Sequence, residues 1–116
     1  MAYAEAKLKS LSIAPRKVRL VADLIRGKKV VDARVILDYT TKGASEPLRK
    51  LLDSAVANAE HQADNTNERI DTDDMVVDRI IVNEGRTLRR IQCAPRGRAM
   101  RIRKRSSQVE LTITGE

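Results

Sequence analysis

Aromatic residues are almost absent from this 116-residue chain, which has two tyrosines, Tyr3 and Tyr39, and neither Phe nor Trp. RNA-recognition domains and single-strand binders stack bases on aromatic rings, so this composition argues against both classes. It also argues against a membrane-surface protein, because interfacial helices anchor through Trp, Phe and Leu. No apolar run approaches the length of a membrane span, and residues 1–7 lack the apolar core of a signal peptide. We therefore expect no membrane partner and a cytoplasmic location.

Residues that support catalysis are also scarce. The single cysteine, Cys93, excludes an intramolecular disulfide and favours a reducing compartment; we interpret it as a small residue in a crowded place. The one histidine, His61, has no nucleophile motif beside it, so we place it on a helix surface. The aspartates from Asp71 to Asp78 lack the glycine and terminal Glu of a calcium loop, which indicates a solvated acidic loop. The sequence predicts no enzyme, no metal site, no cofactor and no small-molecule substrate.

Basic residues are plentiful and unevenly placed. The chain has 23 Lys and Arg against 16 Asp and Glu, a net charge of +7 that favours an anionic partner. Residues 60–84 hold 2 basic and 8 acidic residues, whereas residues 85–116 hold 9 basic and 2 acidic ones. All nine of those basic residues lie between Arg86 and Arg105, a stretch without an acid. Eight of the nine are arginine, and the ninth is Lys104.

The first part of the chain alternates and then becomes helical. Ala2, Ala4, Ala6 and Leu8 share one face of a predicted strand. The pattern then predicts a helix over 12–27, with Ser12 as N-cap, Pro15 in the first turn and Gly27 at the end. Its apolar stripe consists of Val18, Val21, Ala22 and Ile25, and its solvent side carries Arg16, Lys17 and Arg19.

Two more helices and two strands complete the predicted body. A short helix over 31–37 should turn Val31, Val35 and Ile36 inward. The clearest helix has Pro47 in its first turn and Glu46 and Lys50 as an i, i+4 pair. Its core stripe consists of Leu48, Leu51, Leu52, Ala55, Val56 and Ala59. The polar segment 64–74 is expected to be a loop. Strand signals follow over 75–82 and over 109–114, where Val109, Leu111 and Ile113 alternate with polar residues.

The basic stretch has the pattern of an antiparallel hairpin. Its legs are 86–92 and 100–105, and Pro95 and Gly97 mark the turn, where Gly97 should adopt positive φ. Alternation puts cations on both faces, so neither face covers a core cheaply. About eight residues a leg at roughly 3.3 Å each give a projection of about 25–30 Å. We predict an α+β fold with three helices packed on a small antiparallel three-stranded sheet and a long protruding basic β-hairpin. The whole chain, 1–116, is one domain, with a body of residues 1–85 and 106–116 and an arm of residues 86–105.

Arginine favours planar, bidentate phosphate contacts, so we interpret the arm as a finger inserted into folded nucleic acid. The predicted RNA-binding residues are Arg16, Lys17, Arg19, Arg86, Arg89, Arg90, Arg96, Arg98, Arg101, Arg103, Lys104 and Arg105. A solvated hairpin without a partner is the simplest alternative. An architectural DNA-binding protein with a β-arm and a proline wedge at Pro95 is another, and obligate dimerisation would distinguish it. A metal-dependent nuclease using the carboxylates of 71–78 is a third.

Three collinear segments resemble one known family. Residues 14–28, APRKVRLVADLIRGK, are similar to the first helix of bacterial large-subunit ribosomal protein twenty-two; so are 54–60, SAVANAE, in the third helix, and 97–107, GRAMRIRKRSS, in the returning leg. Where the family usually has Ser immediately before the helix proline, this chain has Ala14. Where the family usually has Pro-Arg-Ala-Lys/Arg ahead of Gly97, this chain has Cys93-Ala94-Pro95-Arg96.

The resemblance implies a structural role in the large ribosomal subunit, with binding to 23S ribosomal RNA and a part in subunit assembly. It implies a body beside the exit of the nascent-peptide tunnel and an arm that lines the tunnel wall. The implied partners are ribosomal RNA, ribosomal protein four at the constriction and the nascent peptide, and the protein should be a monomer outside the ribosome. The tip would lie near the macrolide site. The tunnel-facing residues carried over are Leu88, Arg89, Arg90, Arg96, Gly97, Arg98 and Ala99.

Overall fold

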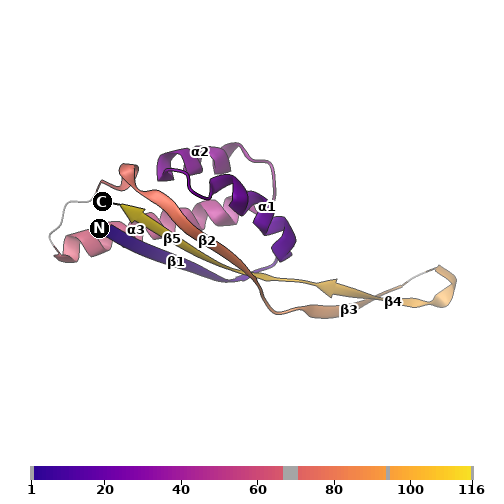
Figure 1. The fold of residues 1–116 in the computed structure, drawn as a ribbon. Coiled ribbons are helices and arrows are strands. Elements are labelled where there is room, and N and C mark those ends of the chain that lie inside the picture. The colour runs from indigo at the N-terminus through magenta and orange to yellow at the C-terminus, as the bar shows by residue number, and fades with distance from the viewer. Residues whose placement is uncertain (1, 67–70, 94, 116) are drawn as a thin grey trace.

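The computed structural model describes residues 2–66, 71–93 and 95–115, which form three helices and five strands (Figure 1). In chain order the elements are β1 (Ala2–Leu11), α1 (Pro15–Ile25), α2 (Val30–Tyr39), α3 (Ser45–Thr66), β2 (Val76–Glu84), β3 (Leu88–Cys93), β4 (Ala99–Lys104) and β5 (Ser107–Gly115). Single 3₁₀ turns, η1 (Thr72–Asp74) and η2 (Pro95–Gly97), precede β2 and β4. The predicted α+β class is confirmed.

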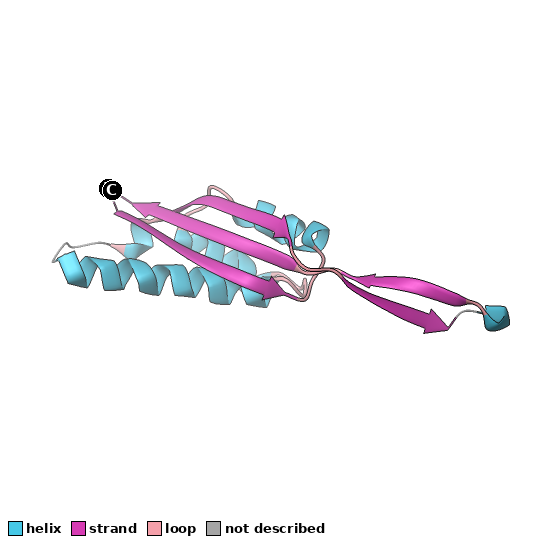
Figure 2. Ribbon diagram, turned by 90° about the horizontal axis from the view of Figure 1, so that it is seen from below, coloured by secondary structure: helices cyan, strands magenta, loops and turns pink. Residues whose placement is uncertain are grey.

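Strands β1, β5 and β2 form an antiparallel sheet in that order, with the last strand of the chain in the centre. Central β5 alternates as predicted: Val109, Leu111 and Ile113 are buried. Figure 2 shows the helices on one face of this sheet, which explains why one face of each strand is apolar. The predicted stripes of α1 and α3 are both buried in this core.

The inward face predicted for α2 is wrong at two of its three positions, Val31 and Val35, whereas Ile36 is partly buried against the core as predicted. Val31 and Val35 are 44% and 50% exposed, and the buried positions are Val30, Ala33 and Leu37. The reason is tertiary, because the N–H of Val30 donates to Met75 O at 2.9 Å and starts the helix one residue earlier. This bond anchors the start of α2 beside β2, and the core-facing stripe is Val30, Ala33 and Leu37.

The predicted Ser12 cap is also wrong. Ala14 occupies the N-cap of α1 with extended φ/ψ of −61° and 139°, and no side chain caps the helix there. Pro15 at N1 sets this geometry, because a residue before proline is driven to extended backbone and proline needs no N–H partner. Ser12 lies in the preceding bend and is exposed.

The predicted loop over 64–74 is partly wrong. Helix α3 continues to Thr66, because Ala63 is buried and extends the apolar stripe by one more turn. Residues 72–74 form η1, and 67–70 lie outside the described residues. None of the described helices is long and apolar enough to cross a membrane.

Candidate nucleic-acid interface

Strands β3 and β4 form a separate two-stranded sheet that extends from the end of the body opposite both termini (Figures 1 and 2). The molecule is elongated as a result, with extents of 66 × 26 × 16 Å. All six residues of β3 pair with β4, from Leu88 opposite Lys104 to Cys93 opposite Ala99. The predicted hairpin is confirmed, although β3 begins two residues beyond the predicted start of its leg.

The register confirms that both faces of the hairpin carry cations. Arg89 pairs directly with Arg103, and Arg101 lies on the same face opposite Ile91. Arg90 lies on the other face opposite Ile102. Like charges directly opposite each other destabilise a strand pair, so the Arg89–Arg103 pair weakens the isolated hairpin. An arrangement of this kind is suited to an anion that lies across both strands.

Apolar side chains on the hairpin are also in contact with solvent. Ile91 is 77% exposed and Met100 is 62% exposed. Cys93, which we predicted in a crowded place, is exposed as well, so that prediction is wrong. In the described part of the chain, no helix or body strand packs extensively on the hairpin to cover these residues. His61 lies on the surface of α3, as predicted.

The tip turns through two consecutive residues with positive φ. Gly97 has φ of 71°, as its position in the turn predicted, and Arg96 has φ of 65° and ψ of 31°. The sequence does not indicate an arginine in the left-handed region, since it marks only glycine for such a conformation. Pro95, Arg96 and Gly97 form η2, and Arg96, Arg98 and Ala99 are exposed. Ala94 lies outside the described residues.

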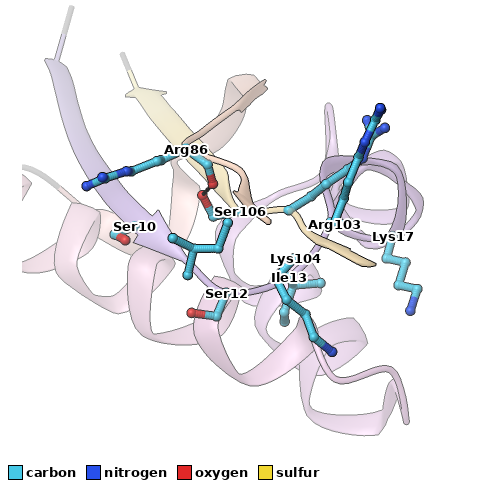
Figure 3. Close-up of a pocket in the computed structure, with 11 residues that line it drawn as sticks. Ser10, Ser12, Ile13, Lys17, Arg86, Arg103, Lys104 and Ser106 are labelled. Carbon is cyan, nitrogen blue, oxygen red and sulfur yellow. Dashed lines mark hydrogen bonds between the residues drawn. The ribbon is translucent and has the colours of Figure 1, made fainter. Parts of the chain in front are cut away.

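The junction between sheet and hairpin is held by short hydrogen bonds. The N–H of Gly85 donates to Ser106 O at 2.8 Å, and the Ser106 hydroxyl donates to Arg86 O at 2.5 Å (Figure 3). This side-chain bond occupies the Arg86 carbonyl, and regular pairing resumes only at Leu88. Arg105 forms an ion pair with Glu84 at 3.2 Å on the same junction.

Arg19 of α1 and Arg26, the residue at its C-cap, hold the outer edge of β2. Arg19 donates from Nε and Nη2 to Val82 O at 3.4 and 3.1 Å, and Arg26 donates from Nη2 to Ile80 O at 2.9 Å. Arg26 also pairs with Asp23. These contacts satisfy edge carbonyls that would otherwise be open to another strand. Arg16 and Lys17, by contrast, extend from the first turn of α1 into solvent.

Neither tyrosine is placed to stack on a base held by the hairpin. Tyr3 lies near the start of β1 and Tyr39 at the end of α2. The Tyr3 hydroxyl donates to Glu5 at 3.1 Å, and this hydrogen bond to a carboxylate raises the pKa of Tyr3. A nucleic acid at the hairpin would therefore be contacted through its phosphates, sugars and shape.

The chain matches one known protein family over nearly its whole length. The family described as Ribosomal protein L22p/L17e matches residues 6–114, from β1 to β5. The chain belongs to this family. It is 51% identical over 113 residues to the large ribosomal subunit protein uL22 of Desulfitobacterium hafniense, covering 97% of this chain and 95% of that protein. It is 50% identical over 111 residues to the protein of the same name from Oceanobacillus iheyensis, covering 96% and 94%.

The L22p/L17e match confirms the resemblance seen in the three sequence segments. Members of the family are structural proteins, so the nuclease alternative is set aside and the chain is not an enzyme. Among the residues that the structure describes, no three His, Cys, Asp or Glu side chains are grouped to hold a metal ion.

Sequence reasoning missed two groups of residues that the structure brings to the edge of β2 and to the start of the arm. The first is the role of Arg26, which shares with Arg19 the edge of β2; its i, i+7 spacing from Arg19, at the end of the predicted helix, was the available signal. The second is the involvement of Ser10, Ser12 and Ile13, which lie beside the start of the arm. No local sequence pattern marks these residues, because only the pairing of the sheet strands brings the arm close to them.

Proposed function

We propose that this chain is a structural constituent of the large ribosomal subunit, in the cytoplasm, whose arm inserts into folded ribosomal RNA. Family membership supports the subunit and the RNA partner. The observation that carries the insertion is the pairing of Arg89 with Arg103 on a hairpin that has cations on both faces. Cations on both faces allow the ribbon to contact phosphates on both of its sides at once, as insertion into folded RNA requires.

The proposed chemistry is phosphate binding by arginine. Guanidinium groups on each face form bidentate hydrogen bonds to phosphate oxygens, and the RNA charge offsets repulsion between neighbouring arginines. On one face these groups are Arg89, Arg101 and Arg103, and on the other face the cations are Arg90 and Lys104. Arg16, Lys17, Arg19, Arg86, Arg96, Arg98 and Arg105 extend the same surface to the body and to the tip. Of these, Arg19 has part of its donor capacity bound to Val82 O.

The proposal includes a position at the nascent-peptide tunnel. The body would lie at the subunit surface, and the arm would run inward to line the tunnel wall opposite ribosomal protein four. Leu88, Arg89, Arg90, Arg96, Gly97, Arg98 and Ala99 would face the nascent peptide. The positive φ at Arg96 and Gly97 supports this role for the tip, since it gives a narrow turn with exposed side chains. Outside the ribosome we propose a monomer.

The test is competition binding to purified protein at physiological salt, with naked large-subunit ribosomal RNA against an equal mass of duplex DNA. We expect strong preference for the RNA, because only a folded RNA can surround the arm and contact both of its faces. Equal competition would show a non-selective polycation and would favour the DNA-architectural alternative.

A further inference from the structure

A cleft of about 740 Å³ lies where the arm leaves the body, and we call it the root cleft. The body side consists of the end of β1 and the β1–α1 bend, including Ser10, Ser12 and Ile13 (Figure 3). The arm side includes Arg86 and Arg103. Pockets of roughly 300–1,000 Å³ hold small-molecule ligands, so this cleft has room for about one or two nucleotides of a single strand.

The charged residues that line the root cleft are all basic. Five cations line it and none of its lining residues is acidic. They are Lys17 from α1 and Arg86, Arg103, Lys104 and Arg105 from the arm. Within the described part of the chain, only Arg105 of these five has an ion pair, with Glu84 at 3.2 Å. The other four cations can therefore bind an anion from outside the protein.

A second cleft of about 620 Å³ continues from the first around the start of α1. The two share Ala14, Lys17 and Arg105, and the second adds Arg16 and Arg19, with Glu84 as its single acid. Arg103 and Lys104 of the root cleft are also residues of β4. The cationic surface is therefore continuous from the arm to α1, which suits one polyanion that follows this path.

The uncharged groups of the root cleft indicate which part of a nucleic acid it receives. None of its lining residues is aromatic, so bases find no ring to stack on, and the guanidinium groups of the lining arginines are engaged most strongly by phosphates. Ile13 and Leu88 offer apolar contact to a sugar, and the exposed hydroxyls of Ser10 and Ser12 suit the 2′-OH of ribose. The ligand that fits is a sugar–phosphate backbone.

Each wall of the root cleft is held by hydrogen bonds of its own. The hydroxyl of Ser107, which is fully buried, donates to Ile13 O at 2.5 Å and ties the β1–α1 bend to β5. On the arm side, Ser106 holds Arg86 O. A Cβ on Gly85 would lie 2.8 Å from Ser106 Oγ, so the two segments approach too closely for another residue.

We infer that the root cleft binds the backbone of one single-stranded RNA segment and thereby fixes the direction in which the arm leaves the body. This inference rests on the proposed function, since the RNA is that of the large subunit. Because the ligand contacts both sides, its binding joins the body and the arm into one rigid unit. The arm surface beyond Leu88 is a separate set of contacts.

The experiment combines charge removal with site-directed cleavage of the RNA. Lys17→Gln is compared with Lys28→Gln, an exposed lysine just beyond the other end of α1 that lies outside both clefts. We expect Lys17→Gln alone to lower the salt slope of binding, by about 0.7 for one single-strand phosphate contact. In a Cys93→Ser background, a hydroxyl-radical source attached at Ser12→Cys should cleave a single run of a few nucleotides on one strand. Ser12 and Cys93 are both exposed, so neither substitution disturbs the core, and circular dichroism checks the fold.

Each outcome decides between the two proposals. A lower slope for Lys17→Gln only, with one discrete cleavage site, supports the root cleft. Equal slopes for the two lysine variants, with no discrete cleavage, overturn it while wild-type binding still supports the proposed function. Paired cleavage on two strands would mean that the cleft meets a duplex and would also overturn it. If the wild-type protein does not prefer the ribosomal RNA, both proposals fail.

Discussion

Ala14 shows how a single residue limits the stability of α1. It has the backbone of an N-cap, but its methyl group accepts no hydrogen bond from the first turn. Serine at such a position accepts from the N–H of N2 or N3. The family's usual serine would therefore supply a hydrogen bond that this chain lacks.

Replacing Ala14 with Ser should raise the free energy of unfolding by about 1 kcal/mol, or the melting temperature by about 4 °C. Thermal unfolding followed by circular dichroism measures the change. Ala57→Ser is the matched control, because Ala57 is exposed in the middle of α3 and serine there should destabilise by about 0.5 kcal/mol. A loss of stability in Ala14→Ser would show that the N-cap geometry is wrong.

At the scale of the element, the hairpin carries like charges at the expense of its own stability. Two strands alone are marginal in water, and Arg89 opposite Arg103 weakens them further. The α1–β2 contact shows the opposite arrangement, in which Arg19 and Arg26 are engaged by strand carbonyls. The arginines beside β2 therefore donate to the backbone of that strand, whereas the arginines of the hairpin are exposed to solvent.

Arg89→Glu should affect stability and binding in opposite directions. In the free protein the introduced carboxylate, directly opposite Arg103, should stabilise the hairpin by roughly 0.2–1 kcal/mol, seen as slower hydrogen exchange of the β3 amides. Affinity for large-subunit RNA should fall, and the salt slope should decrease by roughly 0.7–0.9 if Arg89 contacts one phosphate. Arg89→Gln removes the repulsion without adding an ion pair, so its exchange rates should lie between those of the wild type and Arg89→Glu. Unchanged RNA affinity would contradict the role proposed for this face.

At the scale of the whole molecule, the core and the arm depend on different residues. Every member of the buried core lies outside residues 86–105. Gly85 and Ser106 are already joined by a backbone hydrogen bond, so the sheet strands are closed at the root without the arm. The division into a body and an arm is consequently testable by deletion.

Replacing residues 86–105 with Asn-Gly, a two-residue hairpin turn, should leave a folded body with a cooperative thermal transition. Its affinity for large-subunit RNA should fall sharply, and the salt slope should decrease by roughly 0.7–0.9 for each phosphate that the arm neutralises in the full chain. Binding measured from about 50 to about 200 mM salt gives both quantities. A slope equal to that of the full chain would exclude the arm as the main RNA-binding element, and absence of the transition would show that the body does not fold alone.

The sequence by itself determined the stripes of α1 and α3, the alternation of β5 and the cationic hairpin with its glycine turn. Each of these depends on residues a few positions apart, whose spacing reports directly on helix or strand periodicity. The inward face of α2 needed the bond between Val30 and Met75, which are far apart in the chain. The root cleft likewise required the sheet, since β5 brings Ser107 against Ile13 and places the arm beside Ser12. Contacts of this range leave no local pattern, and only the tertiary structure decides them.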